Sequence, residues 1–161
     1  MRHDITLKVN GEVWPLDVEP TDVLLEVLRT RVGVTSPKPG CERGDCGSCT
    51  VLLDGRTVRS CLVLAVEVDG HEVVTVEGLS LDGLTALQEW LVERSAFQCG
   101  YCAPGVILSA AELLADTPHP SRHDVQEAIA GNLCRCTGYV PIIDAVLAAV
   151  QASADPIARE G

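Results

Sequence analysis

The chain has 161 residues, enough for one ordinary domain or two small ones, and nearly half of them are apolar, as in soluble globular proteins. Its formal charge of −11 argues against non-specific nucleic-acid binding, because that requires a basic surface. No apolar run reaches the roughly 18 residues that span a bilayer, and the start of the chain lacks the apolar core of a signal peptide. We therefore expect no membrane span and a cytoplasmic location.

The first 77 residues favour strands. Apolar residues alternate over 5–9, Asn10-Gly11 supplies a hairpin turn, and a second strand follows over 13–18. Thr21 can cap a helix that places Leu24, Leu25, Leu28 and Val32 on one face. A second hairpin is predicted over 50–58 around Asp54-Gly55, and another strand over 72–77. The order suggests a β-grasp arrangement, although spacing alone does not fix the topology.

The residues after a boundary at 78–83 favour helices. Leucines at 84, 87 and 91 form one stripe, and apolar positions 107, 110, 111 and 114 form another. Ser121 to Asp124 has the form of a capping box, so a helix is predicted to begin there. Pro141 suits the first turn of a last helix, and the tail from Ala152 onward is expected to be loosely held.

The first of two cysteine sets is Cys41-x4-Cys46-x2-Cys49, followed after eleven residues by Cys61. This spacing is typical of plant-type ferredoxins, in which four thiolates hold a [2Fe–2S] cluster. Glycines at 40, 44 and 47 keep side chains out of the way where the backbone must wrap the cluster closely. A zinc ribbon is the alternative, but zinc ribbons favour paired C-x2-C knuckles and the x4 step fits them poorly.

The second set is Cys99-x2-Cys102 with Cys134-x-Cys136, which we expect to converge between helix ends. Taken alone, this set could hold either zinc or a second cluster. Beside a ferredoxin-type site, a second cluster is the simpler interpretation. Disulfides are a weaker explanation for eight cysteines, because they are typical of small secreted domains. The four histidines, at positions 3, 71, 119 and 123, lie in polar or turn-like contexts and are expected at the surface.

The segments 97–105 (FQCGYCAPG) and 131–139 (GNLCRCTGY) resemble the two signatures of the xanthine oxidase, or molybdenum hydroxylase, family. Residues 40–55 are similar to the ferredoxin loop of that family, and the resemblance runs over about 4–150. Departures are mild: Tyr101 and Ala103 stand where Phe and Thr are common, and Ser48 where Ala is usual. None of them affects a cysteine.

The resemblance implies an α+β fold with two domains. An N-terminal β-grasp, ferredoxin-like domain (1–77) would bind one [2Fe–2S] cluster through Cys41, Cys46, Cys49 and Cys61. A C-terminal all-α four-helix domain (84–161) would bind the other through Cys99, Cys102, Cys134 and Cys136. The family also implies that Gln98 and Cys136 lie against the pterin of a partner subunit.

The implied function is electron transfer within a molybdenum-dependent oxidoreductase complex, in which this chain is the non-catalytic iron–sulfur subunit and contains no catalytic residue. The partners would be a large subunit with molybdopterin, with or without a nucleotide, and a medium subunit with FAD, in a dimer of heterotrimers. Electrons would leave the molybdopterin site through the two clusters to FAD. A free-standing ferredoxin and a zinc-stabilised interaction module are the alternatives.

Overall fold

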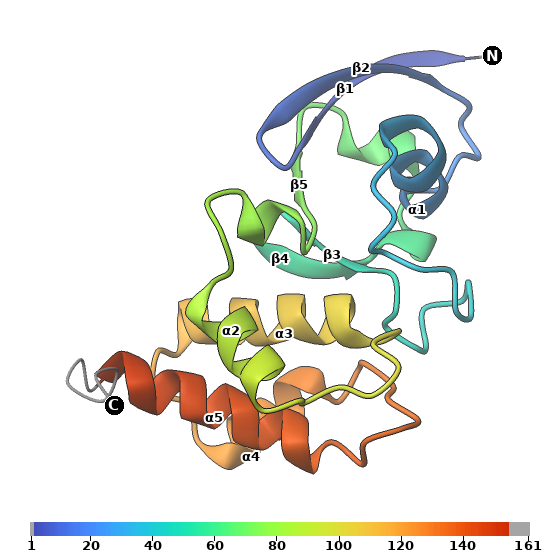
Figure 1. Cartoon of the computed structure of the whole chain (residues 1–161). Helices are drawn as coiled ribbons and strands as arrows, with labels where there is room; N and C mark the ends of the chain where they lie inside the picture. Colours follow the sequence, from blue (N-terminus) through green and yellow to red (C-terminus); the bar gives the residue numbers. More distant parts are fainter. Residues whose placement is uncertain (1, 155–161) are drawn as a thin grey trace.

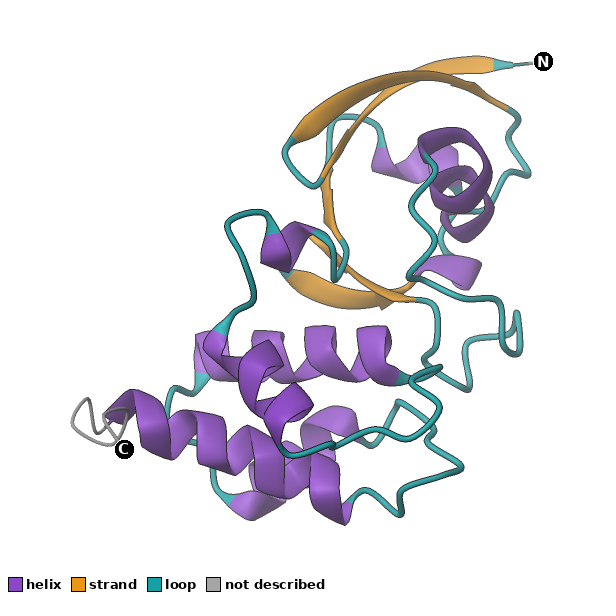
Figure 2. Ribbon diagram, in the orientation of Figure 1, coloured by secondary structure: helices purple, strands orange, loops and turns teal. Residues whose placement is uncertain are grey.

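In the computed structural model, which describes residues 2–154, a strand-rich part lies over a helical part (Figure 1, Figure 2). The main elements are β1 (His3–Val9), β2 (Glu12–Val18), α1 (Leu24–Val27), a π-helical turn η1 (Leu28–Val32), β3 (Thr50–Leu53), β4 (Arg56–Arg59), β5 (Glu72–Val74), α2 (Ala86–Glu93), α3 (Ala103–Asp116), α4 (Arg122–Ile129) and α5 (Val140–Ala154). Short 3-10 turns occupy Ser60–Leu62 (η2), Ala65–Val68 (η3) and Gly78–Ser80 (η4). The predicted α+β class is confirmed.

The strands form one five-stranded sheet in the order β2-β1-β5-β3-β4. β1 and β5 are parallel, and the other neighbours are antiparallel. Asn10 and Gly11 both have positive φ, 51° and 85°, as the predicted tight hairpin turn requires. The alternating apolar residues of β1 are buried and pack, with Leu24, Val27 and Leu28, into the core of this half.

Two boundaries in the strand-rich half differ from the prediction. Helix α1 begins after Val23 rather than at a Thr21 cap, because its first amide, that of Leu24, donates to the carbonyl of Val63 and needs no side-chain cap. β5 ends at Val74, short of residue 77, because the next amide, that of Thr75, donates to the side chain of Asn10 at 2.9 Å instead of to a strand.

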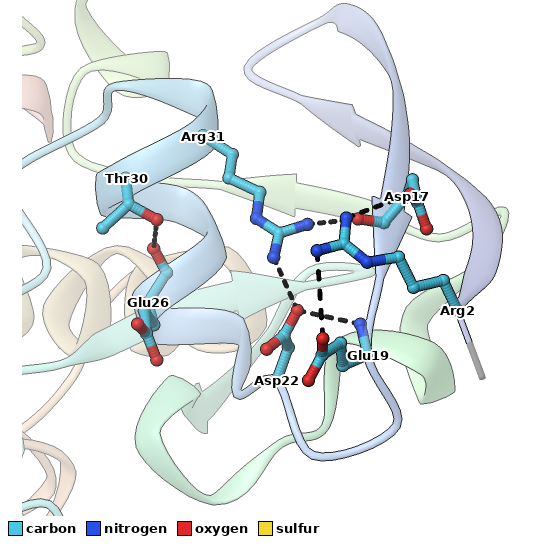
Figure 3. Close-up of polar contacts among 7 residues, drawn as sticks. All are labelled: Arg2, Asp17, Glu19, Asp22, Glu26, Thr30 and Arg31. Carbon is cyan, nitrogen blue, oxygen red and sulfur yellow. Dashed lines mark hydrogen bonds and ion pairs between the residues drawn. The ribbon is translucent and has the colours of Figure 1, made fainter.

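Ion pairs attach the end of β2 to the turn η1 (Figure 3). Arg31 donates to the carbonyl of Asp17 and, at 2.8 Å, to the carboxylate of Asp22. Arg2 pairs with Asp17 at 3.1 Å and with Glu19 at 3.8 Å. These contacts fix the path of the chain just before it enters the loop that contains the first cysteine set.

The four later helices share one apolar core. Its fully buried members include Val106, Val125, Ile142 and Val146. Helix α3 contacts β3 and β4 on one side and α4 and α2 on the other (Figure 1). Since α3 is covered on two sides, it also buries Leu108, which lies outside the single predicted stripe.

The ends of the last two helices test the sequence signals directly. The predicted capping box of α4 is confirmed: the Ser121 hydroxyl accepts from the amide of Asp124, and the Asp124 carboxylate accepts from the amide of Ser121 at 2.7 Å. Helix α5 runs to Ala154 and buries Ala152, so the expectation of a loose tail from residue 152 was wrong there. Residues 155–161 lie outside the described range. Within residues 2–154, no helix combines the length and the apolar character needed to cross a membrane.

Candidate metal centres

The first set of cysteines lies in the loop between η1 and β3 and in the turn after β4. Glu42, Gly44 and Gly47 have positive φ (55°, 87° and 73°), which curls the loop and turns its amides inward. The amide of Cys46 donates to the sulfur of Cys41 at 3.3 Å. The amides of Arg43 and Cys46 lower the pKa of Cys41 to about 7, so the loop stabilises the thiolate, the form that binds iron.

Small residues make room for this loop. A Cβ on Gly40 would lie 2.8 Å from the sulfur of Cys46, and a Cβ on Gly44 would lie 2.5 Å from the side chain of Leu62. A larger residue at Gly40 would push the thiol aside, whereas at Gly44 the exposed Leu62 side chain can turn away and the positive φ is what disfavours other residues. Of the glycines that the sequence singled out, Gly40 is therefore required by close packing against a thiol, and Gly44 and Gly47 by their backbone conformation.

Cys49 and Cys61 form the inner side of the first set and are buried. Burial raises the pKa of Cys61 to about 11, and its contact with Cys49 adds to the effect. Cys61 also lies near Cys41, which connects the inner and outer thiols of this set. The contacts group them as two pairs, Cys41 with Cys46 and Cys49 with Cys61.

The second set gathers at the start of α3 and in the turns that join α4 to α5. The sulfurs of Cys99 and Cys136 are 3.6 Å apart and exposed. Cys102 is buried against Cys134, and burial together with this contact raises its pKa to about 12. The contacts again form two pairs, one at the surface and one inside.

Polar groups around the second set point at its sulfurs. The amide of Tyr101 lowers the pKa of Cys99. Burial acts to raise the pKa of Cys134, but the hydroxyl of Thr137, 3.1 Å from the sulfur, and its amide outweigh burial, so the pKa is lowered. The hydroxyl of Tyr139 accepts from the amide of Cys134 at 2.9 Å and holds this turn in shape.

The paired arrangement bears on what each set can hold. A single zinc ion needs its four ligands around one point, about 2.3 Å from the metal. In the part of the chain that is described, no three His, Cys, Asp or Glu side chains are gathered around a point as ligands of one ion are. Two adjacent pairs of thiols with inward amides suit a two-iron cluster, in which each iron takes two cysteines. The donor sets therefore fit [2Fe–2S] clusters better than zinc.

Gln98 lies at the exposed edge of the second set, where its side-chain amide donates to the carbonyl of Cys136 at 3.1 Å. The two residues with a predicted cofactor contact are thus neighbours on the surface. Histidines 3, 71, 119 and 123 are exposed, as expected, and none lies among these thiols. Sequence reasoning missed Asn132, which is buried between the two sets; its place beside Gly131 in a cysteine-containing turn was the available signal.

Comparisons with known proteins follow the same division of the chain. Residues 7–80 match the family described as 2Fe-2S iron-sulfur cluster binding domain, and residues 75–147 match the [2Fe-2S] binding domain. The chain is 47% identical to the nicotine 6-hydroxylase small subunit of Paenarthrobacter nicotinovorans, over 91% of this chain and 88% of that one. It is 45% identical to the nicotinate dehydrogenase small FeS subunit of Eubacterium barkeri, over 94% and 97%. A chain of quinoline 2-oxidoreductase from Pseudomonas putida 86 superposes with a TM-score of 0.90 at 47% identity, over 95% and 96%.

Proposed function

We propose that this chain passes electrons from a molybdopterin site in one partner subunit to FAD in another. The proposal follows from its family, because the chain belongs to the small [2Fe–2S] subunits of the molybdenum hydroxylase (xanthine oxidase) family. The observation that carries the proposal is the gathering of all eight cysteines into two sets of two pairs. The chain itself would make and break no substrate bonds.

We propose two domains: a β-grasp, ferredoxin-like domain (1–77) and a four-helix domain (84–161), of which residues 155–161 lie outside the described range. Separate apolar cores in the two halves support this division. Cys41, Cys46, Cys49 and Cys61 would hold one cluster, and Cys99, Cys102, Cys134 and Cys136 the other. When bound, a [2Fe–2S] cluster accepts and releases one electron at a time, at a potential that depends on hydrogen bonds to its sulfurs and on solvent exposure.

The residues around each set would adjust these properties. Amides that point at the sulfurs of Cys41 and Cys99 stabilise negative charge there. Burial of Cys49, Cys61 and Cys102 keeps water from the inner side of each site. Tyr101 links the helical half to the loop of the first set, because its hydroxyl donates to the carbonyl of Pro39 at 2.9 Å.

Each set has an exposed leucine beside one of its cysteines. Leu62, next to Cys61, is 60% exposed, and Leu133, next to Cys134, is 57% exposed. We propose that the second set, with Gln98 and Cys136 at its exposed edge, faces the molybdopterin subunit and that the first set faces the FAD subunit. The complex would be a dimer of heterotrimers.

Metal analysis of the purified complex tests the proposal. We expect about four irons and four acid-labile sulfides per chain, in two spectroscopically distinct clusters. Cys49→Ser should remove one electron paramagnetic resonance (EPR) signal and Cys102→Ser the other, so each variant is the control for its counterpart. About half the iron, with zinc in its place, would reject one of the sites. Recovery of the chain from its native host without flavin or molybdenum subunits would reject the complex.

The order of the two sites has a test of its own. If the complex assembles with Cys46→Ser, substrate should still reduce the second site, while reduction of the flavin is slowed. Normal flavin reduction with an oxidised second site would show that the order is reversed.

A further inference from the structure

A buried polar cluster joins the strand-rich half to the helical half, between the two cysteine sets. Its members are Asn132 and Thr50, each 1% exposed, and Ser109, which is 5% exposed. They come from the turn before Cys134, the start of β3 and the middle of α3. Polar side chains in such a place must bond to one another, and here they do.

Asn132 stands at the centre of this cluster. Its side-chain nitrogen donates to the carbonyl of Gly47 at 3.1 Å and to the hydroxyl of Thr50 at 3.2 Å, and its oxygen accepts from the hydroxyl of Ser109 at 2.8 Å. The carbonyl of Gly47 can only accept, so a reversed carboxamide would place two acceptors face to face. The orientation of Asn132 is therefore fixed by its partners.

The backbone approaches so closely here that only glycine fits. A Cβ on Gly105, in α3, would lie 2.4 Å from the carbonyl of Gly47, and a Cβ on Gly47 would lie 2.3 Å from the carbonyl of Gly131. Arg59 closes the other side by donating to Thr50 and to the carbonyl of Gly131, both at 2.8 Å. The two halves are thus held by backbone contact around one carboxamide.

We call this contact between the halves the seam; it consists of Gly47, Thr50, Arg59, Gly105, Ser109 and residues 131–133. One backbone hydrogen bond in the seam connects the two sites. The amide of Leu133 donates to the carbonyl of Cys46 at 2.9 Å. Cys46 belongs to the first set, and Leu133 is bonded directly to Cys134 of the second. A path from one ligand to the other therefore runs through covalent bonds and this single hydrogen bond. Electrons tunnel faster along bonds and hydrogen bonds than across a gap.

We infer that Asn132 is the positioning residue for electron exchange between the two sites, because its carboxamide keeps the Leu133 amide against the Cys46 carbonyl. The inference rests on the proposed function. Asn132 touches neither set of sulfurs; it acts by holding Gly47, the neighbour of Cys46, and by preceding Leu133.

The test uses the assembled complex with Asn132→Ala, which removes all three side-chain bonds. The readout is the magnetic splitting between the two reduced clusters in EPR spectra, which depends on their separation, orientation and bonded contact. We expect full iron and sulfide content, both cluster signals, a clearly reduced splitting, and electron exchange between the clusters slowed several-fold in rapid mixing. Full iron content with wild-type splitting and rate would overturn the inference.

Arg56→Gln is the matched control. Arg56, whose side chain is 68% exposed, also links the two halves through ion pairs from β4 to Glu112 and Asp116 of α3, but it does not contact Asn132 or its partners. Splitting and rate should stay at wild-type values in this variant; an equal loss there would mean that any loosening suffices and would overturn the role of Asn132. If Asn132→Ala does not assemble, Ser109→Ala removes one anchor only and should reduce the splitting to a smaller extent; no reduction would overturn the inference. A wild-type complex without two clusters would instead reject the proposed function.

Discussion

Replacement of Gly47 by alanine measures how much the tight seam contributes to stability. Gly47 has a φ of 73°, and an added Cβ would lie 2.3 Å from a backbone carbonyl that cannot move away alone. The left-handed conformation costs an alanine about 1 kcal/mol, and overpacking against backbone adds about 2 kcal/mol. Gly55→Ala is the matched control, because Gly55 has a φ of 83° with nothing within 4 Å of the added Cβ.

The assay is thermal loss of the visible absorbance of the iron–sulfur clusters in the purified complex. For a chain of this size, about 1 kcal/mol shifts the midpoint by about 2–4 °C, which is the expected effect of Gly55→Ala. The midpoint of Gly47→Ala should be lower than that of Gly55→Ala by a further 4–8 °C, roughly, from the steric contribution alone. Equal shifts in the two variants would refute the reasoning, because they would mean that the Gly131 carbonyl makes room for the added Cβ at no cost in free energy.

Three smaller changes test other parts of the structure. Ser121→Ala removes the cap of α4 and should lower the free energy of unfolding by about 1 kcal/mol in denaturant titrations, whereas Ser153→Ala, at the far end of α5, should have less effect. Tyr101→Phe loses the bond to the Pro39 carbonyl and should speed hydrogen exchange of residues 99–102 without loss of iron; unchanged exchange would contradict the role of that hydroxyl. The pKa of Glu77 is lowered because, although burial acts to raise it, bonds from Ser36 and Thr75 outweigh that effect. The ionised Glu77 carboxylate therefore stabilises the fold above the ordinary glutamate pKa, and this stabilisation is lost as the pH falls through the lower folded pKa. The difference in thermal midpoint between wild type and Glu77→Gln should shrink on acidification, and a constant difference would refute this linkage.

The sequence was most informative where local chemistry decides the structure. The alternation in β1, the Asn10-Gly11 turn and the Ser121 cap were predicted because each depends on residues only a few positions apart. The first cysteine set was predicted as a cluster site from its spacing, the second from its presence beside the first, and the family from its motifs. The assignment of each thiol as a cluster ligand stays a prediction that metal analysis must test.

The errors arose where distant segments meet. The first helical amide of α1 donates a hydrogen bond to the carbonyl of Val63, and the amide of Thr75 donates one to the side chain of Asn10. Neither the start of α1 nor the end of β5 could therefore be inferred from nearby residues. Burial of α3 on two sides depends on the sheet that covers it. The role of Asn132 requires Gly47, Thr50 and Ser109, which are far apart in the sequence.

The two thiol sets also differ in how much chain separates their members, and this affects how the protein is made. The first set lies within residues 41–61, and the strand that joins its hairpin to the rest of the sheet, β5, ends at Val74. The second set needs Cys99 and Cys102 to meet Cys134 and Cys136, which are brought together only when α3 and α4 have folded between them. On the ribosome, the four thiols of the first set therefore emerge before any thiol of the second set, whereas the bonds from Asn132 and Leu133 to the first loop form only later. Iron delivered early would meet the four thiols of the first set but only two of the second, so we expect maturation in the cell to fill the second site last.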